Sequence, residues 1–343
     1  MYRILLITTA LLATLPVQAD EFYKGKTITV VTSTGAGGSY DTLARAISRH
    51  MPRHLEGKPT MIVQNMPGGG NVLATNHMYN IAAKDGTALA TINNAIPLHQ
   101  VLDGRGVRYD VRKFSWLGST GNSNSVTTVW HDAGIKSIQD VMQKEVILGG
   151  TGPASSIVIF PAVMNNVLGT KFKIVTGYKS SAAVDLAMER GEIKSRAGSY
   201  ESIYSQHPDW ISGKKVVFLV QVGAKREKSL PDVPLLTELA KNDEQRRVLQ
   251  LVSSPILLGR PYLAPPGVPA TRVAQLRKAF DDTMKDPEFV AEAKKRRIDL
   301  APMTGDEVAK VVDDTINASA DVVARAKKAM PKRKAKKKKK KAE

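Results

Sequence analysis

A glycine-rich stretch early in the chain has the residue types of an anion-binding loop. It runs from Ser33 to Asp41, between a β-type run and a helix-type run. The first turn of a helix leaves backbone N–H groups unpaired, and the helix dipole adds partial positive charge there. Because glycines let a ligand approach that backbone closely, such a helix start is a ready anion site. Ser39 or Asp41 could cap the helix.

The spacing of the glycines argues against two common nucleotide motifs. A dinucleotide fingerprint needs G-x-G-x-x-G, but Tyr40 stands where the third glycine after Gly35 and Gly37 should be. A phosphate loop closes with Gly-Lys-Ser/Thr, which this loop lacks. Two readings stay open: a site for a small anion such as a carboxylate, or a tight strand–helix turn that binds nothing.

A second loop of the same kind runs from Gly149 to Ser156. The two loops could face each other across a cleft and offer N–H groups and hydroxyls to a ligand with one or two carboxylates, without an arginine clamp. The residues expected to bind this ligand are Thr34, Gly35, Gly37, Gly38, Ser39, Asp41, Asn93, Asn94, Gly150, Thr151, Gly152, Ser155, Ser156, Tyr178, Ser180 and Ser199. Asp41 could instead hold its loop in place. Asn93, Asn94, Tyr178, Ser180 and Ser199 could also be ordinary loop residues.

Catalytic and metal-binding patterns are missing from the sequence. The chain has no cysteine, which excludes cysteine nucleophiles, zinc–thiolate sites and disulfides. It has no G-x-S-x-G elbow. His50 and His54 share helical spacing, but Pro52 lies between them. Asp185 is expected on a solvated helix face. We therefore expect a binding protein without cofactor or metal, and not an enzyme.

The elements that carry these loops alternate between strand-like and helix-like runs. Strand-like runs are expected at 27–32, 61–63, 88–92, 146–148, 172–175 and 216–222. Helix-like runs are expected at 40–51, 71–83, a run ending near 168, 181–190, 235–241, 270–284, 288–297 and 306–328. This alternation predicts an α/β architecture with mainly parallel sheets, and a chain of 343 residues fits two domains.

The two ends of the chain predict export and a basic tail. Arg3, the apolar run from Ile4 to Leu15 and the small residues up to Ala19 predict a signal peptide over residues 1–19 and a periplasmic location. The alternative is a buried N-terminal helix. Much of the net charge of +18 comes from Lys332 to Lys341, so residues 331–343 are expected to form a disordered, solvated tail. No later run is apolar enough for stable membrane insertion, and nucleic acid is not an expected partner of an exported protein.

Four motifs in order resemble one family. The first carries Gly37, Gly38, Asp41, Ala44 and Arg45; the second carries Asn65, Pro67, Gly68, Gly70, Asn71, Asp85 and Gly86; the others are LPDVPLLTEL and LAPPGVPATRVAQLRKAFDDTMKDPEF. Together they cover about residues 22–308 and resemble the receptors of tripartite tricarboxylate transporters, the TctC or Bug-type periplasmic binding proteins.

The resemblance implies a two-lobed type II periplasmic-binding fold. Lobe one would hold residues 22–120 plus 225–330, and lobe two residues 121–224. Backbone amides, hydroxyls and waters of the two glycine-rich loops would hold a di- or tricarboxylate or a related acid. The loaded receptor, expected to be a monomer, would deliver it to the membrane permease subunits. Presentation to a membrane histidine kinase is the alternative, and a secreted enzyme the more distant one.

The chain departs from the family pattern near its middle. Ser180 and Ser181 stand where the family often has two glycines, and Lys194 stands where it has an aspartate. Arg196 also lies in an unusual segment; it could pair with a ligand carboxylate or form a structural ion pair. These departures leave the identity of the ligand open.

Overall fold

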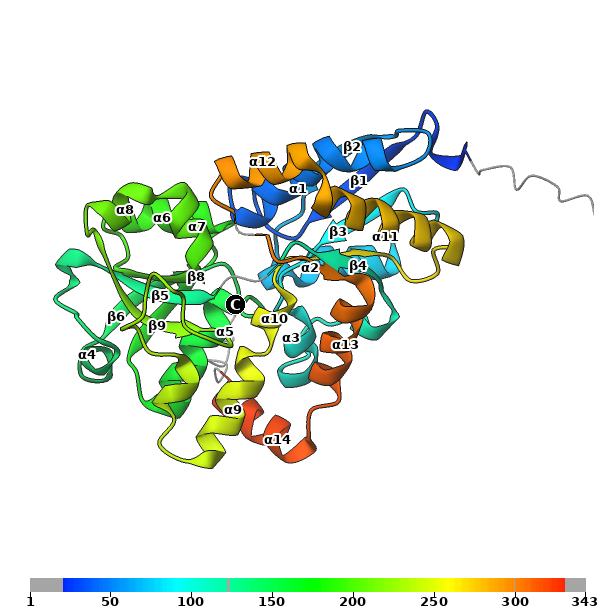
Figure 1. Ribbon diagram of the computed structural model, residues 1–343. Helices are drawn as coiled ribbons and strands as arrows, with labels where there is room; N and C mark the ends of the chain where they lie inside the picture. Colours follow the sequence, from blue (N-terminus) through cyan, green and yellow to red (C-terminus); the bar gives the residue numbers. More distant parts are fainter. Residues whose placement is uncertain (1–20, 122–123, 299, 331–343) are drawn as a thin grey trace, which may run out of the picture.

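The structure is a computed structural model that describes residues 21–121, 124–298 and 300–330, and these residues form two α/β lobes side by side (Figure 1). The sheet of the first lobe has the strand order β11-β4-β10-β3-β1-β2, and that of the second has the order β7-β6-β8-β5-β9. The expected signal peptide, 1–19, and the expected tail, 331–343, lie outside the described residues.

In the first lobe, helices cover both faces of the sheet. Its strands are β1 (Thr27–Thr32), β2 (Thr60–Asn65), β3 (Ala88–Thr91), β4 (Ser115–Ser119), β10 (Pro261–Ala264) and β11 (Met303–Thr304). Its helices are α1 (Ser39–His50), α2 (Val72–Asn80), α3 (Ile96–Leu102), α11 (Ala270–Lys285), α12 (Pro287–Lys295) and α13 (Gly305–Ile316). Successive side chains of a strand point to opposite faces. Ile28 and Val30 therefore pack with the cluster of α1 and α11, whereas Val31 packs with that of α2 and α13.

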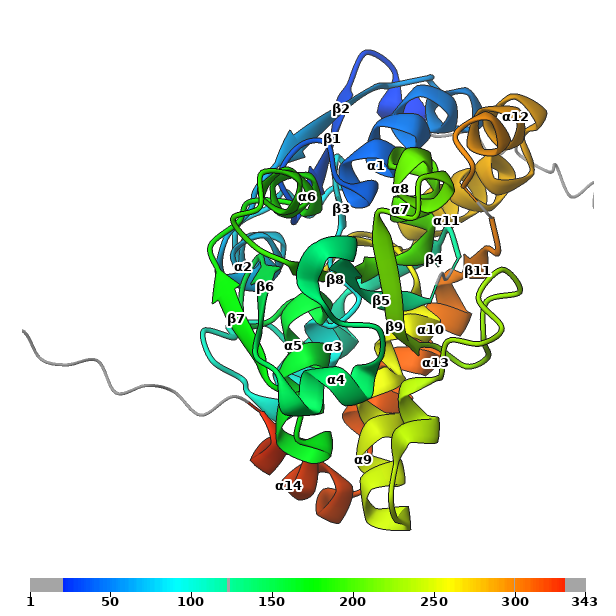
Figure 2. The same ribbon diagram turned by 90° about the vertical axis from the view of Figure 1, so that its left-hand side faces the viewer.

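The second lobe repeats this layering. Its strands are β5 (Ser125–Trp130), β6 (Val146–Gly150), β7 (Phe172–Thr176), β8 (Ser195–Ser199) and β9 (Val216–Val222). Its helices are α4 (Ile138–Gln143), α5 (Ser156–Val163), α6 (Ser181–Glu189), α7 (Tyr200–Gln206) and α8 (Pro208–Ser212). In Figure 2 this lobe faces the viewer, with α6, α7 and α8 toward the first lobe and α4 and α5 on the far side of the sheet from them.

Both sheets are mixed, which corrects the expectation of mainly parallel pairing. β1 pairs parallel with β2 and β3, and β6 pairs parallel with β7 and β8. β10 runs antiparallel to β3 and β4, and β5 runs antiparallel to β8 and β9. Parallel neighbours arise from strand–helix–strand units. β5 and β10 instead enter their sheets where the chain passes from one lobe to the other, so no crossover helix fixes their direction.

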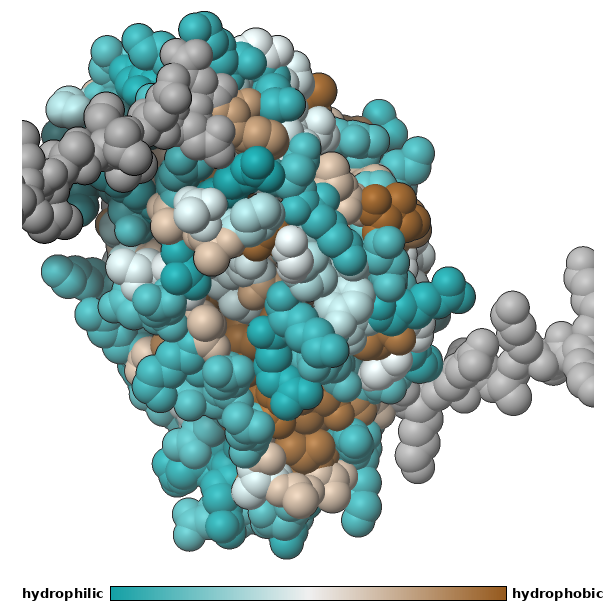
Figure 3. All heavy atoms as spheres, turned by 90° about the vertical axis from the view of Figure 1, so that its right-hand side faces the viewer, coloured by the Kyte–Doolittle hydropathy of each residue, from teal (hydrophilic) through white to brown (hydrophobic). Residues whose placement is uncertain are grey.

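The C-terminal helix reaches across both lobes. α14 (Ala320–Ala329) packs against α9 (Asp243–Ser253), α5 and α3 (Figure 1). One apolar cluster joins Leu98, Ile159, Val248 and Ala326 of these four helices. The expected lobe boundaries therefore stay a prediction. The face at the right of Figure 1 is mainly hydrophilic, interrupted by apolar areas (Figure 3). Within the described ranges, no helix combines the length and apolar character needed to cross a membrane.

Two of the helices predicted in the C-terminal half of the chain are wrong. The run expected at 235–241 is only a 3-10 turn, Leu236–Leu239, and the regular helix α9 begins later. Asn242 caps α9 by accepting a hydrogen bond from Gln245 N–H at 2.8 Å, which is the start signal that the apolar pattern did not reveal. The run expected at 306–328 divides into α13 and α14.

Candidate ligand-binding site

A cavity lies between the two lobes and encloses about 700 Å³ of empty space, part of it open to solvent. Nine of the expected binding residues line it: Thr34, Gly38, Ser39, Asn93, Asn94, Thr151, Ser155, Ser156 and Ser199. Ten further residues complete the lining: Tyr40, Asn71, Ser125, Ile157, Ser181, Arg196, Gly198, Ser202, Ile256 and Arg260. The two glycine-rich loops thus contribute to one cavity.

The starts of two helices meet this cavity from opposite lobes. α1 begins after Gly38 and α5 begins after Ser155, and neither cap residue makes a side-chain cap hydrogen bond. The expected capping by Ser39 or Asp41 is therefore replaced by an extended glycine at the cap position. The partial positive charge of each first turn faces a space lined by hydroxyl groups, which is the electrostatic setting of an anion site.

Asp41 holds the first loop from behind. Its carboxylate accepts hydrogen bonds from Gly37 N–H at 3.0 Å, from Arg45 Nε at 3.1 Å and from Asn65 Nδ2 at 2.9 Å. Asn65 also donates to Thr34 O at 3.0 Å. Burial alone would raise the pKa of Asp41, but these hydrogen bonds lower it below the ordinary value. Asp41 therefore stays ionised and fixes the loop.

The expected residues outside the lining serve the packing of the loops. Gly35 donates its N–H to Lys179 O of the other lobe at 2.9 Å. Gly37 lines a second groove, which shares Ser39 with the cavity and is bounded on the other lobe by Ala182. Gly150 packs under Val158, where an added Cβ would overlap a methyl carbon.

Three more expected residues lie beside the cavity. Tyr178 lines an adjoining hollow that shares Thr34, Asn71 and Thr151 with it. Ser180 caps α6 by accepting a hydrogen bond from Ala183 N–H at 3.2 Å. The carbonyl oxygen of Gly152 accepts a hydrogen bond from the Ser155 hydroxyl at 2.8 Å, and this contact shapes the second loop.

Asn93 joins the lobes at the cavity wall. Its Oδ1 accepts hydrogen bonds from Ala95 N–H at 3.1 Å and from Ser156 N–H, at the start of α5, at 3.3 Å. Its Nδ2 lies 3.5 Å from Ser156 Oγ. One asparagine after β3 thereby satisfies a first-turn N–H of a helix in the other lobe, and the lobes are closed on each other.

Tyr40 links α1 to the segment that precedes β10. Its hydroxyl accepts a hydrogen bond from Asn94 N–H at 3.1 Å and lies 3.5 Å from Gly259 O. Burial of the hydroxyl raises the pKa of Tyr40, so the phenol stays neutral and acts as a hydrogen-bonding group.

Arg196 forms the structural ion pair that was one of its two expected roles, and it also lies at the cavity. Its Nη1 lies 2.5 Å from Asp185 Oδ1 in a buried ion pair, yet the side chain also lines the cavity. The expectation that Asp185 lies on a solvated face is wrong. Only 1% of Asp185 is exposed, because its carboxylate lies between Arg196 and His207.

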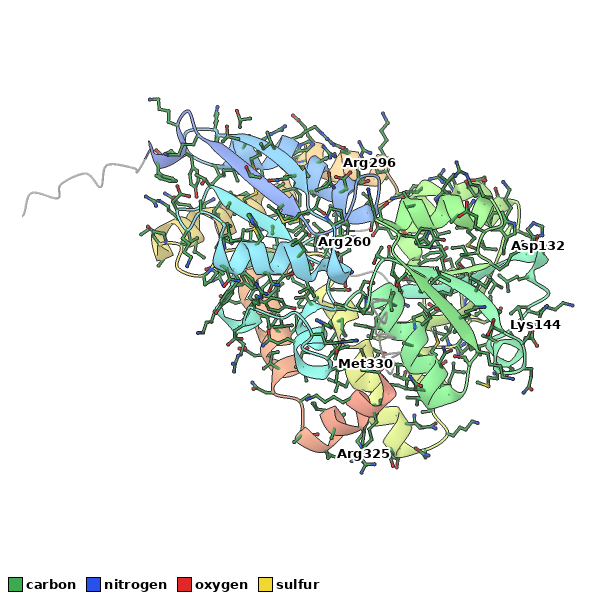
Figure 4. The ribbon with its side chains drawn as sticks, turned by 180° about the vertical axis from the view of Figure 1, so that it is seen from behind. Asp132, Lys144, Arg260, Arg296, Arg325 and Met330 are labelled. Carbon is green, nitrogen blue, oxygen red and sulfur yellow. The ribbon has the colours of Figure 1, made fainter. Side chains whose placement is uncertain are left out.

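Arg260 is a cavity residue that sequence reasoning missed. It lies where the two lobes meet (Figure 4), and its Nη2 is 3.1 Å from Ser199 Oγ and 2.6 Å from Glu201 Oε2 of the second lobe. The sequence feature that could have revealed it is a charged residue inside the apolar run 255–264. An arginine in such a run is seldom buried unless it has a partner.

The charges around the cavity favour an anion. Arg196 and Arg260 are the charged side chains among its described lining residues, and no aspartate or glutamate belongs to that lining. In the described ranges, no group of three or more His, Asp or Glu residues could hold a metal ion.

Two α/β lobes closing on a cavity form the architecture of periplasmic solute-binding proteins. The chain matches the family model of the tripartite tricarboxylate transporter family receptor, TctC, over residues 43–327, and it belongs to this family. Family and fold are those of solute-binding receptors, not of enzymes.

Similar proteins share this fold at low sequence identity. BugD is 19% identical with a TM-score of 0.72, covering 90% of this chain and 98% of its own. MatC of Rhodopseudomonas palustris, with bound malate, is 19% identical with a TM-score of 0.70, covering 87% and 99%. An R. palustris protein with adipate is 17% identical with a TM-score of 0.69, covering 88% and 97%. A UPF0065 protein of Bordetella bronchiseptica is 24% identical over 319 residues, which span 91% of this chain and 88% of the relative.

Proposed function

We propose that this protein captures a small carboxylate in the cavity between its lobes and delivers it, in the periplasm, to the membrane permease of a tripartite tricarboxylate-type transporter. The observation that carries the proposal is the convergence of two helix starts from opposite lobes, α1 and α5, on one cavity, with neither helix capped by the side chain of its own cap residue. Malate and adipate in two solved structures of the same fold support the carboxylate class.

Binding would proceed by closure of the lobes around the acid. A carboxylate would accept hydrogen bonds from first-turn N–H groups and from the hydroxyls of Ser39 and Ser156, which line the cavity. Because water is excluded on closure, these charge-assisted hydrogen bonds are stronger than in solution. The contacts Gly35 to Lys179 and Asn93 to Ser156 then hold the closed form, which is the form that a permease would recognise.

The test is a thermal-shift screen of the purified protein against small carboxylates and matched neutral amides. A ligand that binds only the folded protein adds about 2.7 kcal/mol of stability at a hundredfold excess over Kd. We expect a clear rise in melting temperature with at least one acid and none with its diamide.

The site is tested by Ser39→Leu, which places an apolar side chain in the cavity at the start of α1. The matched control is Ser212→Leu, at an exposed position outside the cavity lining. Ser39→Leu should abolish the shift, and Ser212→Leu should keep it. Equal shifts with acids and diamides, or a shift that survives Ser39→Leu, would contradict the proposal.

A further inference from the structure

Two buried guanidinium groups, one from each lobe, line the same cavity. Arg196 comes from β8 and is 1% exposed; Arg260 comes from the segment before β10 and is 5% exposed. The start of α7 joins them. Arg196 Nη2 donates to Ser202 Oγ at 3.2 Å, Ser202 Oγ donates to Ser199 O at 2.8 Å, and Arg260 Nη2 donates to Ser199 Oγ at 3.1 Å.

The local sequence makes room for Arg196. A Cβ on Gly198 would overlap Arg196 Nη2, so only a glycine lets the guanidinium lie over the strand at this point. Arg196 Nε is buried and has no hydrogen-bond partner among the described residues. A buried donor without a partner costs about 1–3 kcal/mol, and a ligand oxygen in the cavity would remove that cost.

The two ion pairs are oriented with their positive ends toward the cavity. Asp185 pairs with Arg196 and Glu201 pairs with Arg260, but neither carboxylate belongs to the cavity lining as described. Each pair is neutral as a whole, yet a molecule in the cavity meets the guanidinium first. The side-chain contacts of Arg260 with Ser199 and Glu201 both use Nη2, and no other residue in the described ranges bonds to its Nε or Nη1.

We propose that Arg196 and Arg260 form a second anion subsite, so that the ligand of this protein carries two anionic groups. One group would bind at the starts of α1 and α5, and the other would bind to the guanidinium pair. Each guanidinium would donate a charge-assisted hydrogen bond to this group from an N–H that its own ion pair leaves unused. Because Arg260 approaches from the first lobe and Arg196 from the second, the second anionic group would also bridge the lobes. This inference rests on the proposed function and specifies, in addition, that the ligand carries two anionic groups.

Matched pairs of acids test the charge requirement directly. Succinate, glutarate and adipate are each titrated beside their monoamides, succinamate, glutaramate and adipamate, which keep the length but replace one carboxylate with an amide. We expect at least one diacid to bind at least tenfold more tightly than its monoamide.

Two variants assign that preference to the guanidinium. Arg260→Gln should weaken the diacid at least tenfold and the monoamide by less than threefold, which removes most of the difference. Glu201→Gln removes the competing carboxylate and leaves Arg260 in place, so it should keep or increase the preference for the diacid. Thermal melting of each variant without ligand confirms that it is folded.

The outcomes separate this inference from the proposed function. Equal binding of diacids and monoamides would overturn the inference. It would also be overturned if Arg260→Gln and Glu201→Gln weakened both ligands to the same extent, because Arg260 would then have only a structural role. In both cases the carboxylate function stands. If neither the acids of this series nor those of the thermal-shift screen bind the unaltered protein, the carboxylate function itself fails.

Discussion

Gly70 and Gly152 meet backbone to backbone across the two lobes. A Cβ added to Gly70 would lie 2.5 Å from Ala154 N, and a Cβ added to Gly152 would lie 2.5 Å from Gly70 N. Both distances are shorter than van der Waals contact, so the closed form leaves no room for a side chain on either residue. The two glycine-rich segments are therefore complementary surfaces of closure as well as parts of a binding site.

Gly152→Ala tests this contact with little local strain, because the backbone of Gly152 is not in the left-handed region. The added methyl group should keep the lobes from closing fully and weaken carboxylate binding about tenfold, which corresponds to about 1.4 kcal/mol. Isothermal titration measures the affinity.

The control is Gly169→Ala, where φ is 80° and a Cβ meets nothing within 4 Å. This control variant should lower stability by about 1 kcal/mol and leave affinity unchanged. If Gly152→Ala kept its affinity and Gly169→Ala lost it, closure would not depend on the Gly70–Gly152 contact.

Asp41→Asn should loosen the first loop in a pH-dependent way. The pKa of Asp41 is lowered in the folded protein, so its contribution to stability is present above about pH 4, the unfolded value, and is lost as pH falls through the folded pKa. The variant should be less stable by about 1–3 kcal/mol at pH 7, and the difference should shrink in acid. Urea unfolding at several pH values measures it. Asp243→Asn, an exposed aspartate in the first turn of α9, is the control and should change little. A difference that does not vary with pH would contradict the role given to the Asp41 carboxylate.

Glu292 should make the contact between α1 and α12 sensitive to acid. Burial would raise the pKa of Glu292, but hydrogen bonds from His50, Arg296 and Arg49 lower it to about 2. The lowered pKa stabilises the fold fully above pH 4.5, and this stabilisation disappears as pH falls toward 2. Glu292→Gln should therefore lower the melting temperature at pH 7 and converge with the unaltered protein in acid.

Glu288→Gln provides the comparison for Glu292, because 71% of the Glu288 side chain is exposed although it pairs with Arg53. Exposed pairs contribute about 0–1 kcal/mol, so this variant should melt close to the unaltered protein. Equal effects of the two substitutions would refute the special role of Glu292.

Asn71 separates a backbone requirement from a ligand contact. It lines the cavity and has a φ of 85°, in the left-handed region. Asn71→Ala should cost about 1 kcal/mol more stability than Asn71→Gly, because glycine adopts this conformation freely. Both variants remove the same amide from the cavity, so they should lose affinity equally. Thermal melting and titration measure the two effects, and unequal affinities would contradict this account by showing that the backbone conformation at this position also contributes to binding.

The parts of this protein that could be predicted from sequence are those with a local signal. The segments from Thr27 to His50 and from Val146 to Leu168 carry a strand, a glycine-rich loop and a helix in immediate succession, and each lies where it was expected. The polar residues of these loops were correspondingly placed at or beside one cavity, because the carboxyl end of a strand and the start of the next helix are fixed together.

The remaining features depend on contacts between distant residues. The antiparallel direction of β10 follows from the return of the chain out of the second lobe, which no local pattern records. Arg260 pairs with Glu201, which is far from it in sequence, and Asp185 is buried only because Arg196 and His207 close over it. From sequence alone, a charged residue on a helix is predicted to be exposed to solvent, because its buried partner is not visible there.

The central claim is that a carboxylate binds between the starts of α1 and α5. A crystal structure with the acid that gives the largest thermal shift tests it most directly. We predict closed lobes, with carboxylate oxygens about 2.7–3.2 Å from donors at the first turns of both helices. An acid bound outside this cavity, or inside it without contact to either helix start, would contradict the claim.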